Sequence, residues 1–124
     1  MSTRLPLHEP DPALVLTKAV RSAAVRLGVR NRRLAEVLGT SEASISRLTG
    51  SRVIRPDSKE GELALLFLRL FRSLDALTGG DEGKARAWLE AENGHVGGVP
   101  AERIRTVEGL VDVVQYLDAL RGRL

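Results

Sequence analysis

The sequence predicts an all-α protein. Apolar residues recur at helical spacing in several stretches, which are separated by glycines, prolines and good helix-capping residues. No stretch alternates β-branched and polar residues with the period of two that a half-buried strand needs. Of the 124 residues, 43% are hydrophobic and only 3% are aromatic. The chain can therefore bury a core, and we expect that core to be aliphatic.

The first eleven residues are polar and contain prolines, so we expect a flexible N-terminal arm. Asp11 suits an N-cap, and Pro12 suits the first turn of a helix. We therefore expect a first helix over residues 12–27, ended by Gly28. Its expected apolar face consists of Leu14, Leu16, Ala19, Val20, Ala23, Ala24 and Leu27.

Residues 31–50 are expected to form two short helices joined by a tight turn. The first covers residues 32–38, and the second begins after Ser41, which suits an N-cap. Gly39 lies where the backbone must turn sharply without a Cβ in the way. This pattern predicts a helix-turn-helix, although a pair of helices that only pack against each other shows a similar one. The inward residues are Leu34, Ala35, Leu38, Ile45 and Leu48.

The charge distribution favours DNA binding by this motif. The chain carries 19 Lys and Arg and 16 Asp and Glu, which give a formal net charge of +3. Up to Asp57 there are ten basic and five acidic residues, whereas from Ser58 onward there are nine basic and eleven acidic ones. The basic excess lies on the half that contains the helix-turn-helix, as a phosphate-binding surface requires.

The second helix of a helix-turn-helix enters the major groove, and its outward side chains touch base edges. By spacing, the outward residues here are Ser41, Glu42, Ala43, Ser46 and Arg47. Arg47 can bind guanine through both O6 and N7. Three flanking arginines suit phosphates, which position the protein without specifying a sequence: Arg32, Arg33 and Arg52. For each arginine the alternative is an ordinary solvated charge.

A long helix is expected over residues 57–77, with Asp57 and Glu60 as a capping box. One apolar stripe needs only Leu63, Leu66, Phe67, Leu70, Leu74 and Leu77. A second apolar face consists of Ala64, Leu65, Leu68 and Phe71. A helix that is apolar nearly all round is buried on both sides. The second face therefore predicts either a homodimer interface or a central helix that is covered by its own chain.

The remaining residues are expected to be helical as well. A helix over residues 81–92, capped by Asp81, has Ala85, Trp88 and Leu89 inward. The glycine-rich loop over residues 93–100 does not match a phosphate-binding loop, because no Lys-Ser or Lys-Thr pair follows it. A short turn over residues 102–105 precedes a last helix over residues 107–120, capped by Thr106. These segments bring the expected total to about six helices.

The sequence gives no indication of an enzyme. The absence of cysteine excludes disulfides, thiolate metal sites and cysteine nucleophiles. His8 and His95 lie far apart in loop-like regions, and we interpret them as solvated side chains. We expect no metal, no cofactor and no catalytic residue. The longest apolar run, residues 63–68, is too short for a membrane span, and the N-terminus lacks the apolar core of a signal peptide. We therefore expect a cytoplasmic protein.

The two halves resemble two known domains. The helix-turn-helix resembles that of bacterial and phage repressors of the Xre kind, with an Ile-Ser-Arg run at residues 45–47. From about Arg69 onward the chain resembles the toxin-binding domain of Xre/MbcA/ParS-type antitoxins, the partners of RES-type toxins. The landmarks are Ala85, Trp88, Leu89, Asn93, the Gly97-Gly98 loop with Pro100, Thr106, Gly109, Leu120 and Gly122. Two departures are Val96, where the family more often has Leu, and a loop that is one residue shorter before Pro100.

These resemblances imply a helix-turn-helix module over residues 1–57 and a toxin-binding module over residues 58–124. The first would bind operator DNA of the protein's own promoter as a homodimer. The second would bind a RES-type toxin, which degrades NAD or transfers ADP-ribose from it, and would cover its active site. The expected toxin-binding residues are Trp88, Asn93, Arg121, Gly122, Arg123 and Leu124.

Gly122 is expected to let the C-terminal tail bend away from the helices.

Two other functions remain as alternatives to an antitoxin. One is a plain helix-turn-helix repressor whose C-terminal half only oligomerises. The other is a helical adaptor that binds protein partners and has lost DNA binding.

Overall fold

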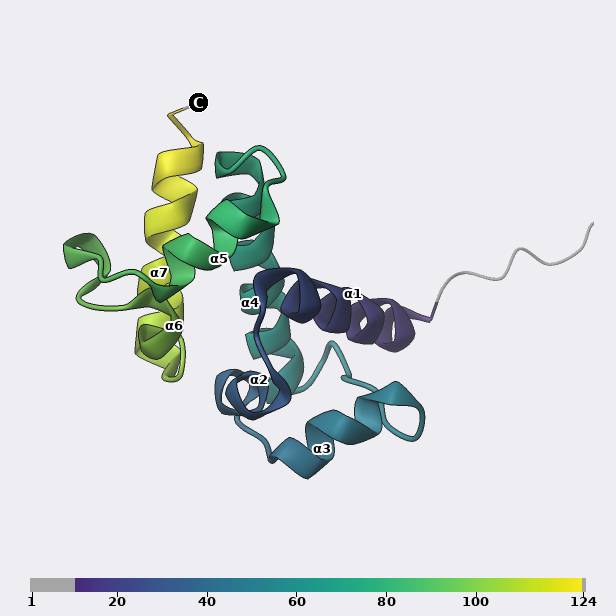
Figure 1. The fold of residues 1–124 in the computed structure, drawn as a ribbon. Helices are drawn as coiled ribbons and strands as arrows, with labels where there is room; N and C mark the ends of the chain where they lie inside the picture. The colour runs from purple at the N-terminus through teal and green to yellow at the C-terminus, as the bar shows by residue number, and fades with distance from the viewer. Residues whose placement is uncertain (1–10, 124) are drawn as a thin grey trace, which may run out of the picture.

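The structure, a computed structural model, describes residues 11–123, so the expected N-terminal arm with His8, and Leu124, lie outside the described residues. The all-α prediction is confirmed: within residues 11–123 there are α-helices and two short 3₁₀-helices but no strand (Figure 1). The helices are α1 (Pro12–Leu27), α2 (Asn31–Leu38), α3 (Glu42–Ser46), η1 (Arg47–Thr49), α4 (Lys59–Leu77), α5 (Glu82–Glu90), η2 (Gly94–Val96), α6 (Pro100–Arg103) and α7 (Val107–Arg121).

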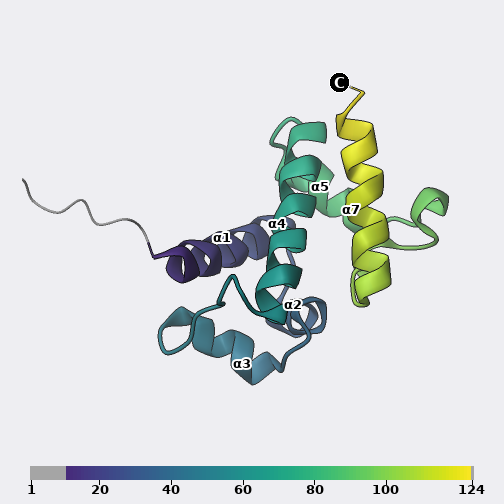
Figure 2. The same cartoon turned by 180° about the vertical axis from the view of Figure 1, so that it is seen from behind.

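Helix α4 lies at the centre, between two groups of helices (Figures 1 and 2). In the N-terminal group, α1, α2 and α3, helices α1 and α2 pack on α4, and α3 packs on α2. In the C-terminal group, α5, α6 and α7, helix α7 lies alongside α4, α5 also contacts α4, and α6 packs on α5 and α7. The expected total of about six helices did not include α6. This helix has only four residues, and the sequence predicts a short turn over residues 102–105 in its place.

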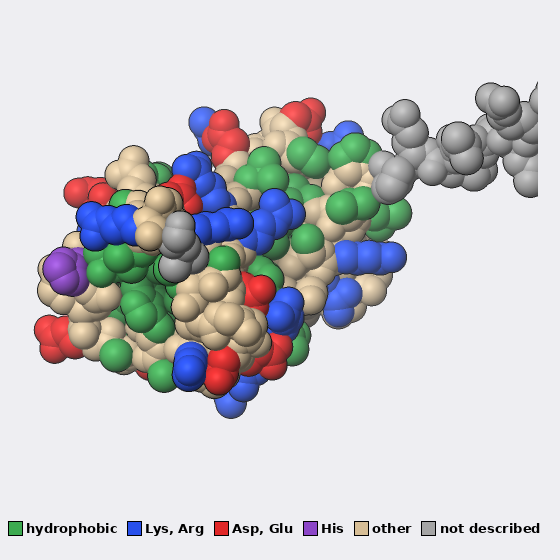
Figure 3. Space-filling view, turned by 90° about the horizontal axis from the view of Figure 1, so that it is seen from above, with side chains coloured by type: hydrophobic (Ala, Val, Ile, Leu, Met, Phe, Trp, Pro, Cys, Tyr) green, Lys and Arg blue, Asp and Glu red, His purple; other side chains and the backbone are tan. Residues whose placement is uncertain are grey.

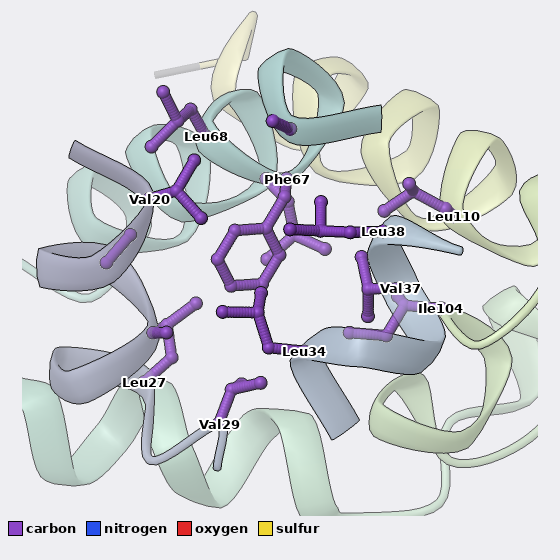
Figure 4. Close-up of a cluster of buried hydrophobic side chains, with 14 of the residues drawn as sticks. Val20, Leu27, Val29, Leu34, Val37, Leu38, Phe67, Leu68, Ile104 and Leu110 are labelled. Carbon is purple, nitrogen blue, oxygen red and sulfur yellow. The ribbon is translucent and has the colours of Figure 1, made fainter. Parts of the chain in front are cut away.

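One core joins the two groups. Phe67 of α4 is fully buried and lies among Leu34 and Leu38 of α2 and side chains of α1 (Figure 4). Val37 of α2 lies beside Ile104, which follows α6 (Figure 4). Phe67 is the one aromatic residue of this buried core within residues 11–123, so the prediction of an aliphatic core is confirmed.

The second apolar face of α4 is mostly covered by its own chain. Ala64 and Leu68 are buried, and Leu68 lies near Val20 of α1 (Figure 4). Phe71 is half-buried, with the Arg26 guanidinium carbon 4.8 Å from its ring centroid. Leu65, at 51% exposed, is the most accessible member of this set.

Most helices begin at the expected caps. The side chains of Asp11, Ser41, Asp81 and Thr106 each accept a hydrogen bond from a backbone N–H of the first turn. The expected capping box of Asp57 and Glu60 is wrong. Ser58 caps α4 instead, by accepting a bond of 2.9 Å from the Gly61 N–H.

One residue of the expected apolar face of the first helix lies at the surface instead. Leu14, expected on the apolar face of the first helix, is 48% exposed, because the buried face of α1 runs through Ala13, Leu16 and Val20 instead. Within residues 11–123, every helix is too short or too polar to span a bilayer.

Candidate nucleic-acid and protein interfaces

Helix α2, the turn at Gly39 and helix α3 form the predicted helix-turn-helix. Gly39 has a left-handed backbone (φ 68°, ψ 35°), and the Thr40 N–H that follows donates to the Ala35 carbonyl over 2.9 Å. The predicted inward residues Leu34, Ala35, Leu38, Ile45 and Leu48 are all buried. The motif is thus anchored to the core through its apolar side.

The five predicted base-reading residues lie on the outer side of the motif. Ser41, Glu42, Ala43, Ser46 and Arg47 are all exposed. Helix α3 is shorter than expected, since it ends at Ser46 and continues as the 3₁₀-helix η1. Arg47 therefore lies on η1, and it forms no ion pair with any residue of the described range 11–123.

Arg52 is held within the protein rather than extended towards solvent. Its Nη1 and Nη2 atoms donate to the two carboxylate oxygens of Glu60 over 2.7 and 2.9 Å, and its Nε donates to the Ser44 carbonyl over 3.1 Å. The side chain is 23% exposed. A two-pronged, partly buried pair of this kind is among the stronger ion pairs in proteins. Arg52 therefore links helix α3 to helix α4, a role that its position in the sequence did not reveal.

Arg33 is likewise paired, but across the junction between the two groups of helices. Its Nη1 donates to Glu90 over 2.8 Å, and its Nη2 lies 3.7 Å from Glu102. Arg105 completes the network by pairing with Glu36 and, over 3.1 Å, with Glu102. Hydrogen bonds to Glu36 and then to Glu102 raise the pKa of Arg105 above its ordinary value. Arg32, in contrast, is exposed.

A second set of polar contacts joins α1 to α4 and α5. Arg26 donates to Glu82 over 3.0 Å and to Asp75 over 3.3 Å. Arg86 donates to the carbonyls of Val25 and Arg26 at the end of α1, both over 3.0 Å, and the Val25 carbonyl also accepts from the Gly28 N–H. With the shared core, these contacts fix the orientation of the helix-turn-helix relative to the C-terminal group. The expected module boundary at residues 57/58 precedes α4, which packs with both groups.

The C-terminal group carries a stack of rings on its surface, which we call the aromatic stack: Trp88, His95 and Tyr116. The ring centroids of Trp88 and Tyr116 are 6.5 Å apart at an interplanar angle of 11°. Those of His95 and Tyr116 are 5.3 Å apart at 12°. Trp88, expected on an inner face, is half-buried, and His95 is exposed as expected but rests on a ring. Helical spacing gave no signal for this group, because its members come from three separate segments.

Asn93 organises the loop that carries His95. Its backbone exchanges two hydrogen bonds with Gly98, of 2.9 and 3.1 Å, and its side-chain oxygen accepts from the His95 N–H over 2.9 Å. Arg103 braces the loop by donating to the Val96 carbonyl over 2.9 Å, and it also pairs with Asp112 over 2.7 Å. The Asn93 side chain is therefore already engaged in an intramolecular bond.

The C-terminal residues continue the helix. Gly122 has helical dihedral angles (φ −66°, ψ −12°), and its N–H donates to the Asp118 carbonyl over 2.9 Å. Within the described residues the chain does not bend away at Gly122, because this backbone bond extends the last turn of α7. Arg121 and Arg123 are exposed. Figure 3 shows Lys and Arg side chains gathered on the face where the chain ends.

Within residues 11–123, no cluster of three or more His, Asp or Glu side chains is arranged to hold a metal ion.

A comparison with curated proteins gives no match. Two family models do match the chain. An antitoxin Xre-like helix-turn-helix domain matches residues 6–69, and an antitoxin Xre/MbcA/ParS C-terminal toxin-binding domain matches residues 73–123. The two matches cover nearly the whole chain and meet within α4. The chain therefore belongs to the Xre-like antitoxins, with a helix-turn-helix domain followed by an Xre/MbcA/ParS toxin-binding domain.

Proposed function

We propose that this protein is the antitoxin of a type II toxin–antitoxin pair. In this proposal the C-terminal domain neutralises a RES-type toxin by covering its active site, and the helix-turn-helix represses the protein's own promoter. The observation that carries the proposal is the presence of both antitoxin domains on one chain, with the recognition face of the helix-turn-helix exposed. The chain itself acts by binding, without catalysis and without a cofactor.

DNA reading is assigned to the exposed side of α3 and η1. Arg47 is the strongest candidate for a base contact, since its guanidinium matches the O6 and N7 acceptors of guanine. Arg32 is assigned to a phosphate. Arg33 and Arg52, each paired with carboxylates, are assigned to holding the helix-turn-helix in place.

Replacing Arg47 by alanine is expected to weaken operator binding by about 1–3 kcal/mol, the usual value of a good base contact. The measurement is fluorescence anisotropy with a duplex from the protein's own promoter at fixed salt. Arg72→Ala is the matched control, because it removes the same charge from an exposed site on α4, outside the helix-turn-helix. Equal affinity of the Arg47→Ala and wild-type proteins for that duplex would contradict the assignment.

We propose that the operator-binding form is a homodimer, because a palindromic operator needs two copies of the helix-turn-helix. The exposed Leu65 and half-buried Phe71 are the part of the predicted α4 interface that remains accessible. Light scattering of the free protein at micromolar concentration checks this, and a monomer would contradict it.

The C-terminal tail is proposed to cover the toxin's active site. Deleting residues 121–124 is expected to leave folding and operator binding unchanged, because Arg121, Gly122 and Arg123 are exposed and contribute little to the core. The deletion should nevertheless impair neutralisation. Growth of cells that co-express the toxin with the full-length or truncated protein measures this effect, alongside a melting curve of each. Full protection by an equally abundant, stable truncated protein would show that the tail is not the inhibitory element.

Two alternative functions make different predictions. A plain repressor would bind operator DNA but no toxin, and its gene would lack a neighbouring RES-type reading frame. A helical adaptor would show no salt-dependent affinity for DNA. The toxin-binding family match over residues 73–123 favours the antitoxin over both.

A further inference from the structure

We propose that the aromatic stack of Trp88, His95 and Tyr116 is the main docking contact for the toxin, separate from the tail that covers its active site. This inference rests on the proposed antitoxin function and names the surface that would supply most of the affinity. The partner chemistry that fits is an apolar side chain, aliphatic or aromatic, that the toxin packs against these rings.

The distribution of aromatic residues is the first argument. The chain has only four: two Phe, one Trp and one Tyr. Phe67 fills the core, and Phe71 packs beneath Arg26. The remaining two, Trp88 and Tyr116, both lie in the region that matches the toxin-binding domain, and they stack at its surface. Trp and Tyr are the residues that most often dominate the binding energy of protein interfaces.

The second argument is that the stack is held rigid before any partner binds. The two backbone bonds between Asn93 and Gly98 close the loop, and the buried Val96 anchors it to the core. Arg103 braces the same loop from α6. These contacts keep the exposed His95 ring on Tyr116. The His95 ring is not held on Tyr116 by burial, because the His95 side chain stays exposed. A preorganised surface of this kind loses less entropy on binding.

The third argument is that several large polar side chains of the C-terminal domain are engaged within the chain. Arg86 and Glu90 of α5 bind groups of α1 and α2. Arg105 binds Glu36 of α2, and Asp118 of α7 binds Ser73 of α4. Trp88 and Tyr116 are half-buried and His95 is exposed, so the stack offers accessible ring surface beside a braced loop.

The test uses the full-length protein and, as the probe, the purified product of the neighbouring reading frame that is expected to encode the RES-type toxin. The double variant His95→Ala/Tyr116→Ala is expected to bind it at least about 30-fold more weakly by calorimetric titration, the effect of losing one interface hot spot. Gln115→Ala is the matched control, since Gln115 is an exposed neighbour on α7 and should leave the affinity unchanged. Melting curves and operator affinity of each variant report on folding.

A second readout uses the single tryptophan. Trp88 is the only tryptophan of the chain, so labelling with 5-fluorotryptophan gives one ¹⁹F resonance. Addition of the unlabelled toxin is expected to shift that resonance in the wild-type protein. The inference is overturned if the folded double variant binds the toxin within twofold of wild type. It is equally overturned if wild type binds the toxin while its ¹⁹F resonance stays unchanged. It is also overturned if the double variant changes self-association of the free protein instead of toxin binding. Absence of any binding by wild type contradicts the antitoxin function itself, and this inference with it.

Discussion

Replacing Phe67 by alanine is expected to lower the free energy of unfolding by about 3–5 kcal/mol, the usual cost of removing a large buried aromatic side chain. Phe67 is fully buried at the point where α1, α2 and α4 meet (Figure 4). Since small domains are stable by only about 5–15 kcal/mol in total, a loss of this size leaves a substantial unfolded population at growth temperature. Because the same core continues to Ile104 and Leu110 of the C-terminal group, operator binding and toxin binding should be lost together.

Urea denaturation measures the stability change, and operator and toxin titrations at rising temperature measure the two functions. Val25→Ala on α1 is the control, because Val25 is 73% exposed and its truncation should change stability by about 0.5 kcal/mol or less. Loss of operator binding by Phe67→Ala with undiminished toxin binding at all temperatures would show that the two domains have separate cores.

The second large effect is expected from Gly109→Ala. An alanine within a helix is normally about 1 kcal/mol more favourable than glycine. Gly109, however, lies in the first turn of α7, where the preceding Arg103 carbonyl passes so close that a Cβ would overlap it. The overlap involves backbone, which cannot rotate away as a side chain does. We therefore expect the sign to reverse, with a loss of about 1–3 kcal/mol as for other overpacked sites.

Thermal melting of the variants tests this reversal. Gly83→Ala is the matched control, because Gly83 is an exposed glycine of the first turn of α5, where a Cβ would meet only a side-chain oxygen of Asp81. That variant should change stability by about 1 kcal/mol or less. A Gly109→Ala protein that melts at or above the wild-type temperature would show that the turn before α7 relaxes freely.

The helices follow from local patterns that the sequence contains. The caps Asp11, Ser41, Asp81 and Thr106 act within their own first turn, so their positions are readable without the fold. The start of α4 was harder to predict, because Asp57 and Ser58 are both good caps. Ser58 caps the helix where the Arg55 carbonyl passes close to Gly61. That close approach exists only in the folded turn, so the sequence does not reveal it.

The candidate sites were predictable only in part, for a different reason. Surface arginines look alike in a sequence, yet Arg47 is unpaired among the described residues while Arg33 and Arg52 bind carboxylates from other elements. The partner of Arg33, Glu90, is brought near only by tertiary packing. The aromatic stack likewise joins residues 88, 95 and 116, which are related by no helical or strand period.

The contacts between the two domains hold them in one relative orientation. The junction between them combines a shared core with ion pairs of Arg26, Arg33 and Arg105. Exposed ion pairs are individually weak, but several of them on one rigid core resist rotation of one domain against the other. The position of a toxin on the C-terminal domain would therefore be fixed relative to the operator.

The central claim is that this chain neutralises a toxin encoded beside it. The most direct measurement is the growth of cells that express the neighbouring RES-type reading frame from an inducible promoter, with or without this protein from a second promoter. We expect the toxin alone to arrest growth and co-expression of this protein to restore it. Continued arrest in the presence of abundant, folded protein would contradict the account.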